Sequence, residues 1–245
     1  MQRSKPNPAA EVIRRQRMNR GDVPTGARLS ESPVAGSNSF PGWHERGYLP
    51  HYDAPGEIQF VTWRQADSLP AQVLGEMHAL AASGRERQSR VLAERSLDAG
   101  FGSCRLRDPD AARVVETSLR HFDGTRYRLC AWCVMPNHVH VLFETLNTPM
   151  SELVESWKKF TALRLNRTAG IEGAFWQADY WDTFIRDEAH FWRTVRYVED
   201  NPVSGGLVRQ PSEWPWSSAH PQWRWTDAPG TSRWHGARLN GPPTQ

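Results

Sequence analysis

The sequence predicts an α+β domain built on a ferredoxin/RRM-like antiparallel sheet with flanking helices. Two β-rich runs, 127–135 and 138–145, are separated only by Pro136-Asn137, which predicts a hairpin of antiparallel strands. The next segment, 150–168, carries its apolar residues at helical spacing. Further helical segments precede and follow these elements, so we expect helices to pack on the sheet.

Each remaining element has a local signal of its own. A β-rich run at 57–63 follows Pro55-Gly56 and predicts the first strand, and 183–186 predicts a short last strand. The other helices are expected at 70–84 with a continuation through Leu92, at 111–122 with Asp110 as the cap, and at 188–200 with Asn201-Pro202 as the end.

The segment 150–168 has the clearest amphipathic pattern in the chain. Its apolar stripe consists of Met150, Leu153, Val154, Trp157, Thr161 and Leu165. We expect this stripe to be the buried face of the helix.

The net charge of +3 is unevenly distributed. Residues 1–40 hold seven Lys or Arg against three Asp or Glu, whereas 41–207 hold 19 against 22. The positive excess therefore lies in the flanks, which excludes a uniformly basic nucleic-acid-binding surface. Both flanks lack apolar periodicity, so we expect a disordered basic tail at 1–42, a folded domain at 43–222 and a flexible tail at 223–245.

Three cysteines give no disulfide framework, and no apolar run approaches the ~20 residues of a membrane helix. With no signal-like N-terminus, the expected location is the cytoplasm, with no membrane partner. Cys130 and Cys133 are three residues apart on an expected strand. Their thiols should therefore point to opposite faces, which disfavours a metal or redox pair.

His138 and His140 are two residues apart on an expected strand, so their side chains should share one face. Two imidazoles spaced roughly 6.5–7 Å along the backbone can converge on one metal ion. The alternative is a pair of exposed histidines without a ligand.

Tyr197 and Asn201 lie four residues apart, on one face of the last expected helix. A tyrosine hydroxyl near a metal is a plausible nucleophile, and a carboxamide oxygen is a hard ligand. The alternative makes Tyr197 a core aromatic and Asn201 a residue of the helix end.

The run WKKFT at 157–161, with Arg164 and Arg167, combines basic and aromatic side chains on one helix. Such a helix can contact phosphates and stack on bases. A solvated face over a packed stripe explains the same residues equally well.

Several motifs occur in one order along the chain. They are WCVMPNHVHVLFE at 132–144, WKKFT at 157–161, FWQ, YWD and IRD between 175 and 187, YVEDNP at 197–202, GLV at 206–208 and WPWSS at 214–218. Together they resemble the REP-associated tyrosine transposases, which are single-tyrosine members of the HUH nucleases related to insertion-sequence transposases. RGYLPHYDAPG at 46–56 and FVTWR at 60–64 also resemble the start of that family.

The resemblance implies an HUH nuclease fold and a role for each matching residue. His138 and His140 match the metal-binding pair, Asn201 matches the residue that completes the metal site, and Tyr197 matches the nucleophile. The cofactor would be Mg²⁺ or Mn²⁺. One departure from the family pattern is Ser204-Gly205-Gly206, where relatives usually carry a more basic or bulkier step.

The implied substrate is single-stranded DNA, a palindromic repeat folded as a hairpin, which Tyr197 would cleave and rejoin through a 5′-phosphotyrosine. By resemblance the protein would be a bacterial, nucleoid-associated monomer rather than a dimer. The candidate phosphate contacts are Lys158, Lys159, Arg164, Arg167, Arg186, Arg193 and Arg196, and the basic tail is a candidate nonspecific tether. Trp176 and Trp181 are candidates either for base stacking or for core packing.

Two other functions remain open at the level of sequence. One is a catalytically silent RRM-like nucleic-acid-binding module, and the other is a metal-dependent phosphodiesterase that uses water. The position of the Tyr197 hydroxyl relative to the two histidines separates them, because a tyrosine directed into the core cannot be a nucleophile.

Overall fold

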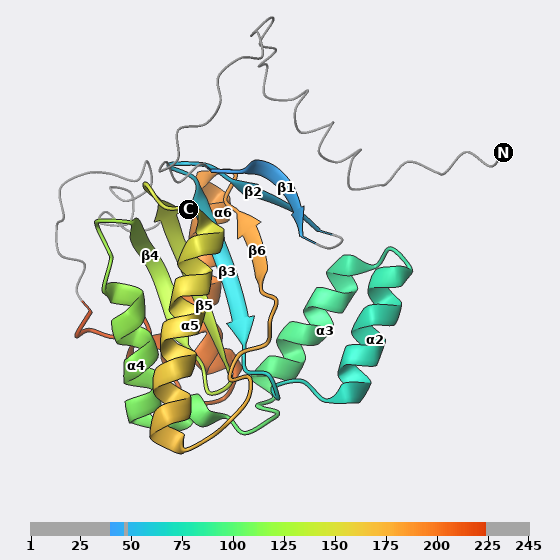
Figure 1. Cartoon of the computed structure of the whole chain (residues 1–245), viewed down its shortest axis with the longest axis vertical. Coiled ribbons are helices and arrows are strands. Elements are labelled where there is room, and N and C mark those ends of the chain that lie inside the picture. Colours follow the sequence, from blue (N-terminus) through green and yellow to red (C-terminus); the bar gives the residue numbers. More distant parts are fainter. Residues whose placement is uncertain (1–39, 47–48, 224–245) are drawn as a thin grey trace, which may run out of the picture.

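The computed structural model describes residues 40–46 and 49–223. Its centre is a four-stranded sheet with the order β4-β5-β3-β6, in which every neighbouring pair is antiparallel (Figure 1). The strands are β3 (Ile58–Arg64), β4 (Tyr127–Val134), β5 (His138–Thr145) and β6 (Trp181–Phe184). The first of these strands, β3, is central, as in ferredoxin-like sheets, so the predicted fold class is confirmed.

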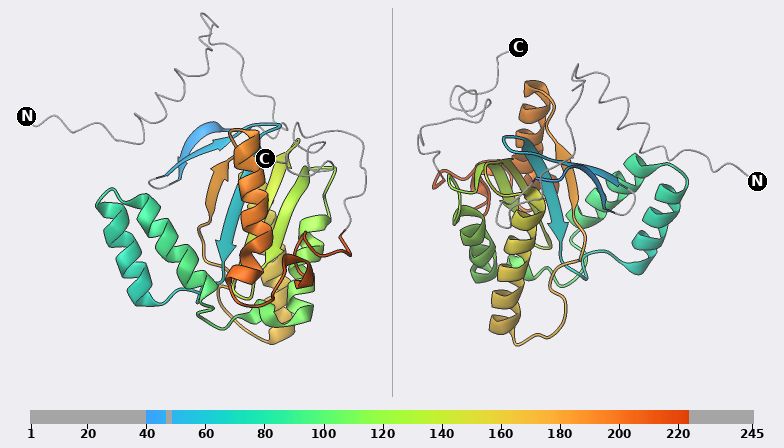
Figure 2. Two further views of the ribbon diagram at one scale, coloured as in Figure 1. Left: turned by 180° about the vertical axis from the view of Figure 1, so that it is seen from behind. Right: turned by 45° about the horizontal axis from the view of Figure 1, so that its top comes forward.

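Helices cover both faces of this sheet. Helices α4 (Pro109–Arg120) and α5 (Met150–Ala169) pack on one face, and α6 (Glu188–Ser204) lies across the other, as the two views of Figure 2 show. The predicted stripe of α5 is its buried face: the six residues named above are those buried in the helix.

Two further pairs of elements flank the sheet. Helices α2 (Ala71–Ala82) and α3 (Glu86–Asp98) form a helical hairpin on the β6 side (Figure 1). Strands β1 (Gly42–Arg46) and β2 (Leu49–Asp53) form a separate two-stranded sheet. No strand is predicted for these residues from the sequence, because they show no alternation of apolar and polar side chains and include Pro50. Short 3₁₀ turns, η1 (Arg105–Arg107) and η2 (Pro211–Glu213), complete the order.

Alternation along β3 and β5 divides their side chains between two cores. Val61, Trp63, Val139 and Val141 face α4 and α5 in the larger hydrophobic cluster. On the other face, Phe60 and Leu142 pack with residues of α6, including Phe191, Trp192, Val195 and Val198. A one-residue change of register would exchange these two sets, so the burial of both faces fixes the register.

Two helix boundaries differ from the expected ones. Asp108, not Asp110, caps α4, because its carboxylate accepts the backbone N–H of Asp110 at 3.0 Å. Helix α6 continues through Asn201 and Pro202 to Ser204, although Pro202 has no N–H to donate within the helix. The chain leaves the helix at Gly206, whose φ of +67° is accessible to glycine at little cost. The Ser204-Gly205-Gly206 step is thus the end of α6.

The predicted tails lie almost wholly outside the described residues, so the basic N-terminal segment and the C-terminal segment remain sequence-based predictions. Within the described part, no helix combines the length and the apolar character needed to cross a membrane.

The burial of α5 leads to a stability prediction with a control on the same helix. Leu153 is 1% exposed, whereas Leu163 is 71% exposed. Leu153→Ala leaves a cavity in the larger core and should lower the free energy of unfolding by about 2–5 kcal/mol. Leu163→Ala should change it by less than about 0.5 kcal/mol. Urea denaturation followed by circular dichroism measures both, and equal effects would contradict the assigned core.

Candidate active site

The site is built around two histidines on β5. His138 and His140 are each 1% exposed, and their Nε2 atoms lie 3.0 Å apart. Val139, between them, faces the opposite core. The predicted sharing of one face is therefore realised, but the histidines are buried rather than exposed.

Asn137 fixes the tautomer of His138. The Asn137 Nδ2 donates to the carbonyl oxygens of Leu97, at 3.2 Å, and Phe101, at 3.0 Å. The Oδ1 atom of this amide must therefore face His138 Nδ1, which lies 2.7 Å away. Since an amide oxygen only accepts, Nδ1 of His138 carries the proton and Nε2 keeps its lone pair.

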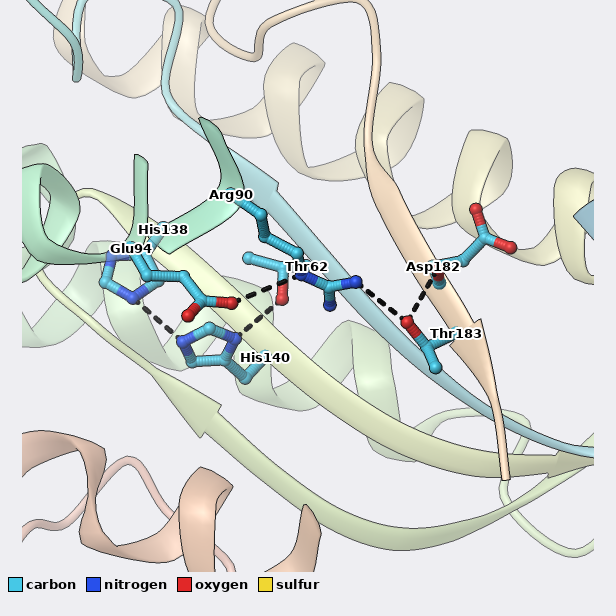
Figure 3. Close-up of polar contacts among 7 residues, drawn as sticks. All are labelled: Thr62, Arg90, Glu94, His138, His140, Asp182 and Thr183. Carbon is cyan, nitrogen blue, oxygen red and sulfur yellow. Dashed lines mark hydrogen bonds and ion pairs between the residues drawn. The ribbon is translucent and has the colours of Figure 1, made fainter. Parts of the chain in front are cut away.

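Thr62 holds the second imidazole. Its Oγ1 lies 2.8 Å from His140 Nδ1, across the β3–β5 pair, where Thr62 and His140 are directly opposite (Figure 3). A hydroxyl can donate or accept, so Thr62 supports either tautomer of His140. Phe60 stacks on the same ring, with the centroids 5.7 Å apart. The orientation of His140 is thus fixed from two sides.

Burial also keeps the pair uncharged. It lowers the pKa of His138 to about 3, against a smaller raising effect of the Asn201 side chain. The pKa of His140 is well below its ordinary value because of burial, with His138 and Arg90 acting in the same direction. Both imidazoles are therefore neutral at neutral pH, which is the protonation state that binds metal ions.

Tyr197 lies beside the histidines rather than in the core. Its ring centroid is 5.3 Å from that of His140, and the ring is only partly buried. It is edge-on to Phe60, with the centroids 5.8 Å apart. The ring packs against the edge of the α6-side core and also lines an open hollow, so it is not enclosed by apolar side chains.

Asn201 is placed one turn further along α6, as predicted. It is 2% exposed, and its Oδ1 atom is buried without a hydrogen-bond partner among the described residues. An unsatisfied buried acceptor is costly, and a bound cation would satisfy it. The two Nε2 atoms hydrogen-bond to each other, and a cation would replace the shared proton once His140 Nδ1–H donates to Thr62. The orphaned oxygen and two Nε2 lone pairs would then be a donor set for a hard or borderline divalent ion.

The spacing of the nitrogens also suits one ion. Adjacent ligands of an octahedral ion at roughly 2.1 Å lie roughly 3.0 Å from each other, which is the separation of the two Nε2 atoms. His138, His140 and Asn201 therefore fit a divalent metal with several positions left open. Among the described residues no group of three His, Cys, Asp or Glu side chains forms an alternative metal site.

Helix α3 contributes charged groups that the sequence analysis missed. Arg90 Nη1 donates to Thr183 Oγ1 at 2.9 Å, and Arg90 Nε pairs with Glu94 at 3.2 Å. Figure 3 shows these residues beside the histidines, with the Glu94 carboxylate directed to Arg90. The helical spacing of Arg90, Glu94 and Asp98 is visible in the sequence, but nothing there shows that α3 folds against the site.

The charged groups of α3 shift the pKa of Tyr197 in opposite directions. Burial raises the pKa of Tyr197 above its ordinary value, and Glu94 and Asp98 raise it further, whereas Arg90 lowers it. The phenol is therefore protonated at neutral pH. Burial and Glu94 also raise the pKa of Asp98, to about 6.

An open hollow gives Tyr197 access to solvent and ligands. Its volume is about 350 Å³, and its lining includes Phe60, Arg90, Thr183, Arg193 and Tyr197. Two guanidinium groups and the Glu94 carboxylate, which pairs with Arg90, thus lie at the wall of this hollow. Arg193 was predicted, and Arg90 was not.

The other predicted phosphate contacts are distributed over both faces. Lys158, Lys159, Arg164 and Arg167 lie on α5, which covers the face opposite to the histidines. Three of them have local partners: Lys158 donates to the Ala178 carbonyl oxygen, Lys159 pairs with Glu155 at 2.6 Å, and Arg164 lies over the Phe160 ring. The structure does not bring these four residues together with Tyr197.

The remaining candidates lie closer to the site. Arg186 precedes α6 and Arg196 lies within it, and both are exposed.

Of the two tryptophans considered for base stacking, Trp176 is a core residue, because it is 6% exposed and its indole N–H donates to Thr161 Oγ1 at 2.9 Å. Trp181 is partly exposed beside Arg64, so only Trp181 remains available for base stacking.

The prediction that the thiols of Cys130 and Cys133 point to opposite faces of the sheet is wrong. A bulge between Leu129 and Ala131 shifts the register of β4, so Cys130 and Cys133 lie in the same hydrophobic cluster. Burial raises the pKa of Cys133 well above its ordinary value, which disfavours the thiolate form that metal binding and redox chemistry need.

Part of this chain is similar to known proteins. Residues 105–201 match the family described as "Transposase IS200 like", and this span contains His138, His140, Tyr197 and Asn201. A REP-associated tyrosine transposase of Escherichia coli is 30% identical over 94 residues, which cover 38% of this chain and 55% of that protein. A Haemophilus influenzae protein named for the same group is 28% identical over 108 residues, covering 38% of this chain and 60% of its own length.

A solved structure of a REP-associated tyrosine transposase bound to a REP hairpin also aligns with this chain. It is 19% identical, covers 74% of this chain and 90% of its own, and has a TM-score of 0.45. The chain spans little more than half the length of the two sequence relatives. The family match and the two sequence relatives confirm the resemblance to the REP-associated tyrosine transposases that the motifs predicted, and residues 105–201 are the part similar to the IS200-like transposase family.

Proposed function

We propose that this protein is a metal-dependent tyrosine transposase that cleaves and rejoins single-stranded DNA through a 5′-phosphotyrosine intermediate. The observation that carries the proposal is the position of Tyr197, whose ring lies 5.3 Å from that of His140 and faces an open hollow. A phosphodiester in this hollow would contact Tyr197, whose ring lies beside the buried His140.

His138, His140 and Asn201 would hold a divalent cation, Mg²⁺ or Mn²⁺. When bound, the cation supplies positive charge that polarises the scissile phosphodiester and offsets the charge of the transition state. Asn137 and Thr62 keep the two imidazole rings oriented for this role. Arg90 and Arg193 neutralise phosphate charge at the rim of the hollow.

Tyr197 would act as the nucleophile. Its hydroxyl oxygen forms a bond to phosphorus and loses its proton, while the bond from phosphorus to the 3′ oxygen breaks and that oxygen leaves as a hydroxyl. The DNA 5′-phosphate remains on Tyr197. Because a phosphodiester is retained, attack by another 3′-hydroxyl rejoins the strands without a nucleotide cofactor.

The substrate would be a single-stranded palindromic repeat folded as a hairpin. A strand without a rigid duplex backbone can bend into line with a tyrosine that is held on a helix. The neighbouring protein described with a REP hairpin motivates this choice. We propose a monomer, because Tyr197 lies beside His140 of its own chain and needs no exchange between subunits.

The two alternative functions make different demands on the site. A silent binding module needs neither a buried, converging pair of imidazoles nor an orphaned amide oxygen beside a tyrosine, and these features favour an enzyme. A phosphodiesterase that uses water needs no tyrosine at the hollow. A covalent adduct distinguishes the proposed mechanism from both.

Replacement of the tyrosine hydroxyl tests the nucleophile. Tyr197→Phe should lower cleavage of a single-stranded hairpin about 10³-fold or more and abolish the covalent adduct. DNA binding should persist. Denaturing gels of labelled DNA measure both products.

Tyr127→Phe is the matched control for the loss of a tyrosine hydroxyl. Its hydroxyl donates to the Leu119 carbonyl in the core on the opposite face, so this variant should lose stability and keep the adduct. Adduct formation by Tyr197→Phe would overturn the assignment of the nucleophile.

Removal of metal tests the cofactor. Chelation with EDTA should abolish cleavage and leave hairpin binding in place, and added Mn²⁺ or Mg²⁺ should restore cleavage. His138→Ala should not be restored at the same metal concentration, because it removes one of the three proposed ligands. Cleavage that is unaffected by EDTA would contradict a metal-dependent mechanism.

Asn137 is expected to act through His138 rather than on the DNA. Asn137→Ala removes the acceptor that fixes the Nδ1 proton, and it should weaken Mn²⁺ binding about 10–100-fold. Excess Mn²⁺ should recover most of the cleavage rate. Asn147→Ala, at an exposed asparagine, should not alter Mn²⁺ affinity in calorimetric titrations. Equal affinities of the two variants would show that Asn137 has no positioning role.

A further inference from the structure

A second hollow adjoins the site on the β6 side of the sheet. It has a volume of about 170 Å³, which suits one planar ring system better than a drug-sized molecule. Its lining includes Thr62, Arg64, Asp179, Tyr180 and Trp181. Thr62 also contacts His140, so the hollow begins directly beside the histidine pair.

Arg64 is the unusual member of this lining. It is 5% exposed, and its hydrogen bonds, to Gln65 O at 3.5 Å and Ser68 Oγ at 3.4 Å, are both long. No carboxylate of the described residues lies within ion-pair distance of its guanidinium. A buried cation with such weak partners is costly to the fold. The arrangement therefore points to a ligand with hydrogen-bond acceptors.

The opposite side of the hollow offers an acceptor and aromatic rings. Asp179 is exposed at its edge and acts electrostatically on Arg64. The Trp181 ring faces the guanidinium, with Arg64 Cζ 5.9 Å from the ring centroid. Aromatic faces with nearby hydrogen-bonding groups are the usual elements of unpaired-base recognition.

Strand register relates this hollow to the reaction centre. His140 is paired with Thr62, and Thr62 is paired with Trp181, so the three residues form one row across β5, β3 and β6. Neighbouring strands are about 4.8 Å apart, which places Trp181 roughly 10 Å from His140. A base held at Trp181 would belong to a nucleotide near the scissile phosphate.

We propose that this hollow, lined by Arg64, Asp179 and Trp181, binds one unpaired guanine that flanks the cleaved bond. Arg64 would donate to O6 and N7, Asp179 would accept from the N1 and N2 protons, and Trp181 would stack on the ring. No other base offers acceptors on one edge and two donors on another in this way. This specificity role rests on the proposed DNA cleavage.

The test uses the full chain and a synthetic DNA hairpin with randomised single-stranded flanks. Bound molecules are sequenced for the wild-type protein and for Asp179→Asn, Trp181→Ala and Arg64→Lys. The wild type should enrich guanine about tenfold at one flank position. Asp179→Asn and Trp181→Ala should remove that enrichment and retain hairpin binding. Asp179 is exposed, so its variant should fold even if Arg64→Lys does not.

Phe160→Ala is the matched control, because it removes a 47% exposed ring on α5 and should keep the guanine enrichment. Flank profiles that are identical in the wild type, Asp179→Asn and Trp181→Ala would overturn the proposal. Equal weakening for every flank sequence in Arg64→Lys would also overturn it, since this is the behaviour of a phosphate site. If the wild-type protein bound none of the randomised hairpins, the proposal would be overturned as well.

Adduct formation on the same hairpins separates this test from that of the proposed function. A covalent adduct without a sensitive guanine position refutes only the guanine pocket. A sensitive guanine position without an adduct refutes only the cleavage mechanism.

Discussion

The structure depends on the burial of two imidazoles between a sheet and a helix. Pairing of β5 with β3 turns His138 and His140 to the face covered by α6, and burial keeps both rings neutral. Neutral imidazoles in an apolar core are tolerated only if their nitrogens are satisfied. Asn137 and Thr62 satisfy the Nδ1 atoms, and the two Nε2 atoms share a hydrogen bond whose proton a cation would replace. The position of Tyr197 on α6 follows from the same packing, since its ring covers His140.

The charge distribution becomes intelligible in this arrangement. The central part of the chain has an excess of acidic residues, which at first disfavours a nucleic-acid partner. The described groups near Tyr197, however, are mixed: Glu94 and Asp98 raise the pKa of its hydroxyl, and Arg90 lowers it. A nuclease needs positive charge where the phosphate is cleaved rather than over its whole surface. Two arginines at the hollow, together with a divalent cation, would meet that need without a basic average.

Much of this could be predicted from the sequence, because the relevant signals are periodic or local. The alternation of β5 places both histidines on one face, and the four-residue spacing does the same for Tyr197 and Asn201. Arg90, Thr62 and Arg64 could not be assigned, because their roles depend on the position of α3 and on the β3–β5 register, which no local pattern specifies. The bulge in β4 moved Cys130 to the other face for the same reason, and the four basic residues of α5 could be assigned to a helix but not to a side of the sheet.

The central claim is that His138, His140 and Asn201 form a metal site next to Tyr197. Anomalous X-ray scattering from crystals grown with Mn²⁺ tests it most directly, because it locates the ion without reference to activity. A single manganese peak in contact with both Nε2 atoms and the Asn201 carboxamide oxygen is the predicted result. A peak at another set of side chains, or the absence of any peak between these three residues at saturating Mn²⁺, would contradict it.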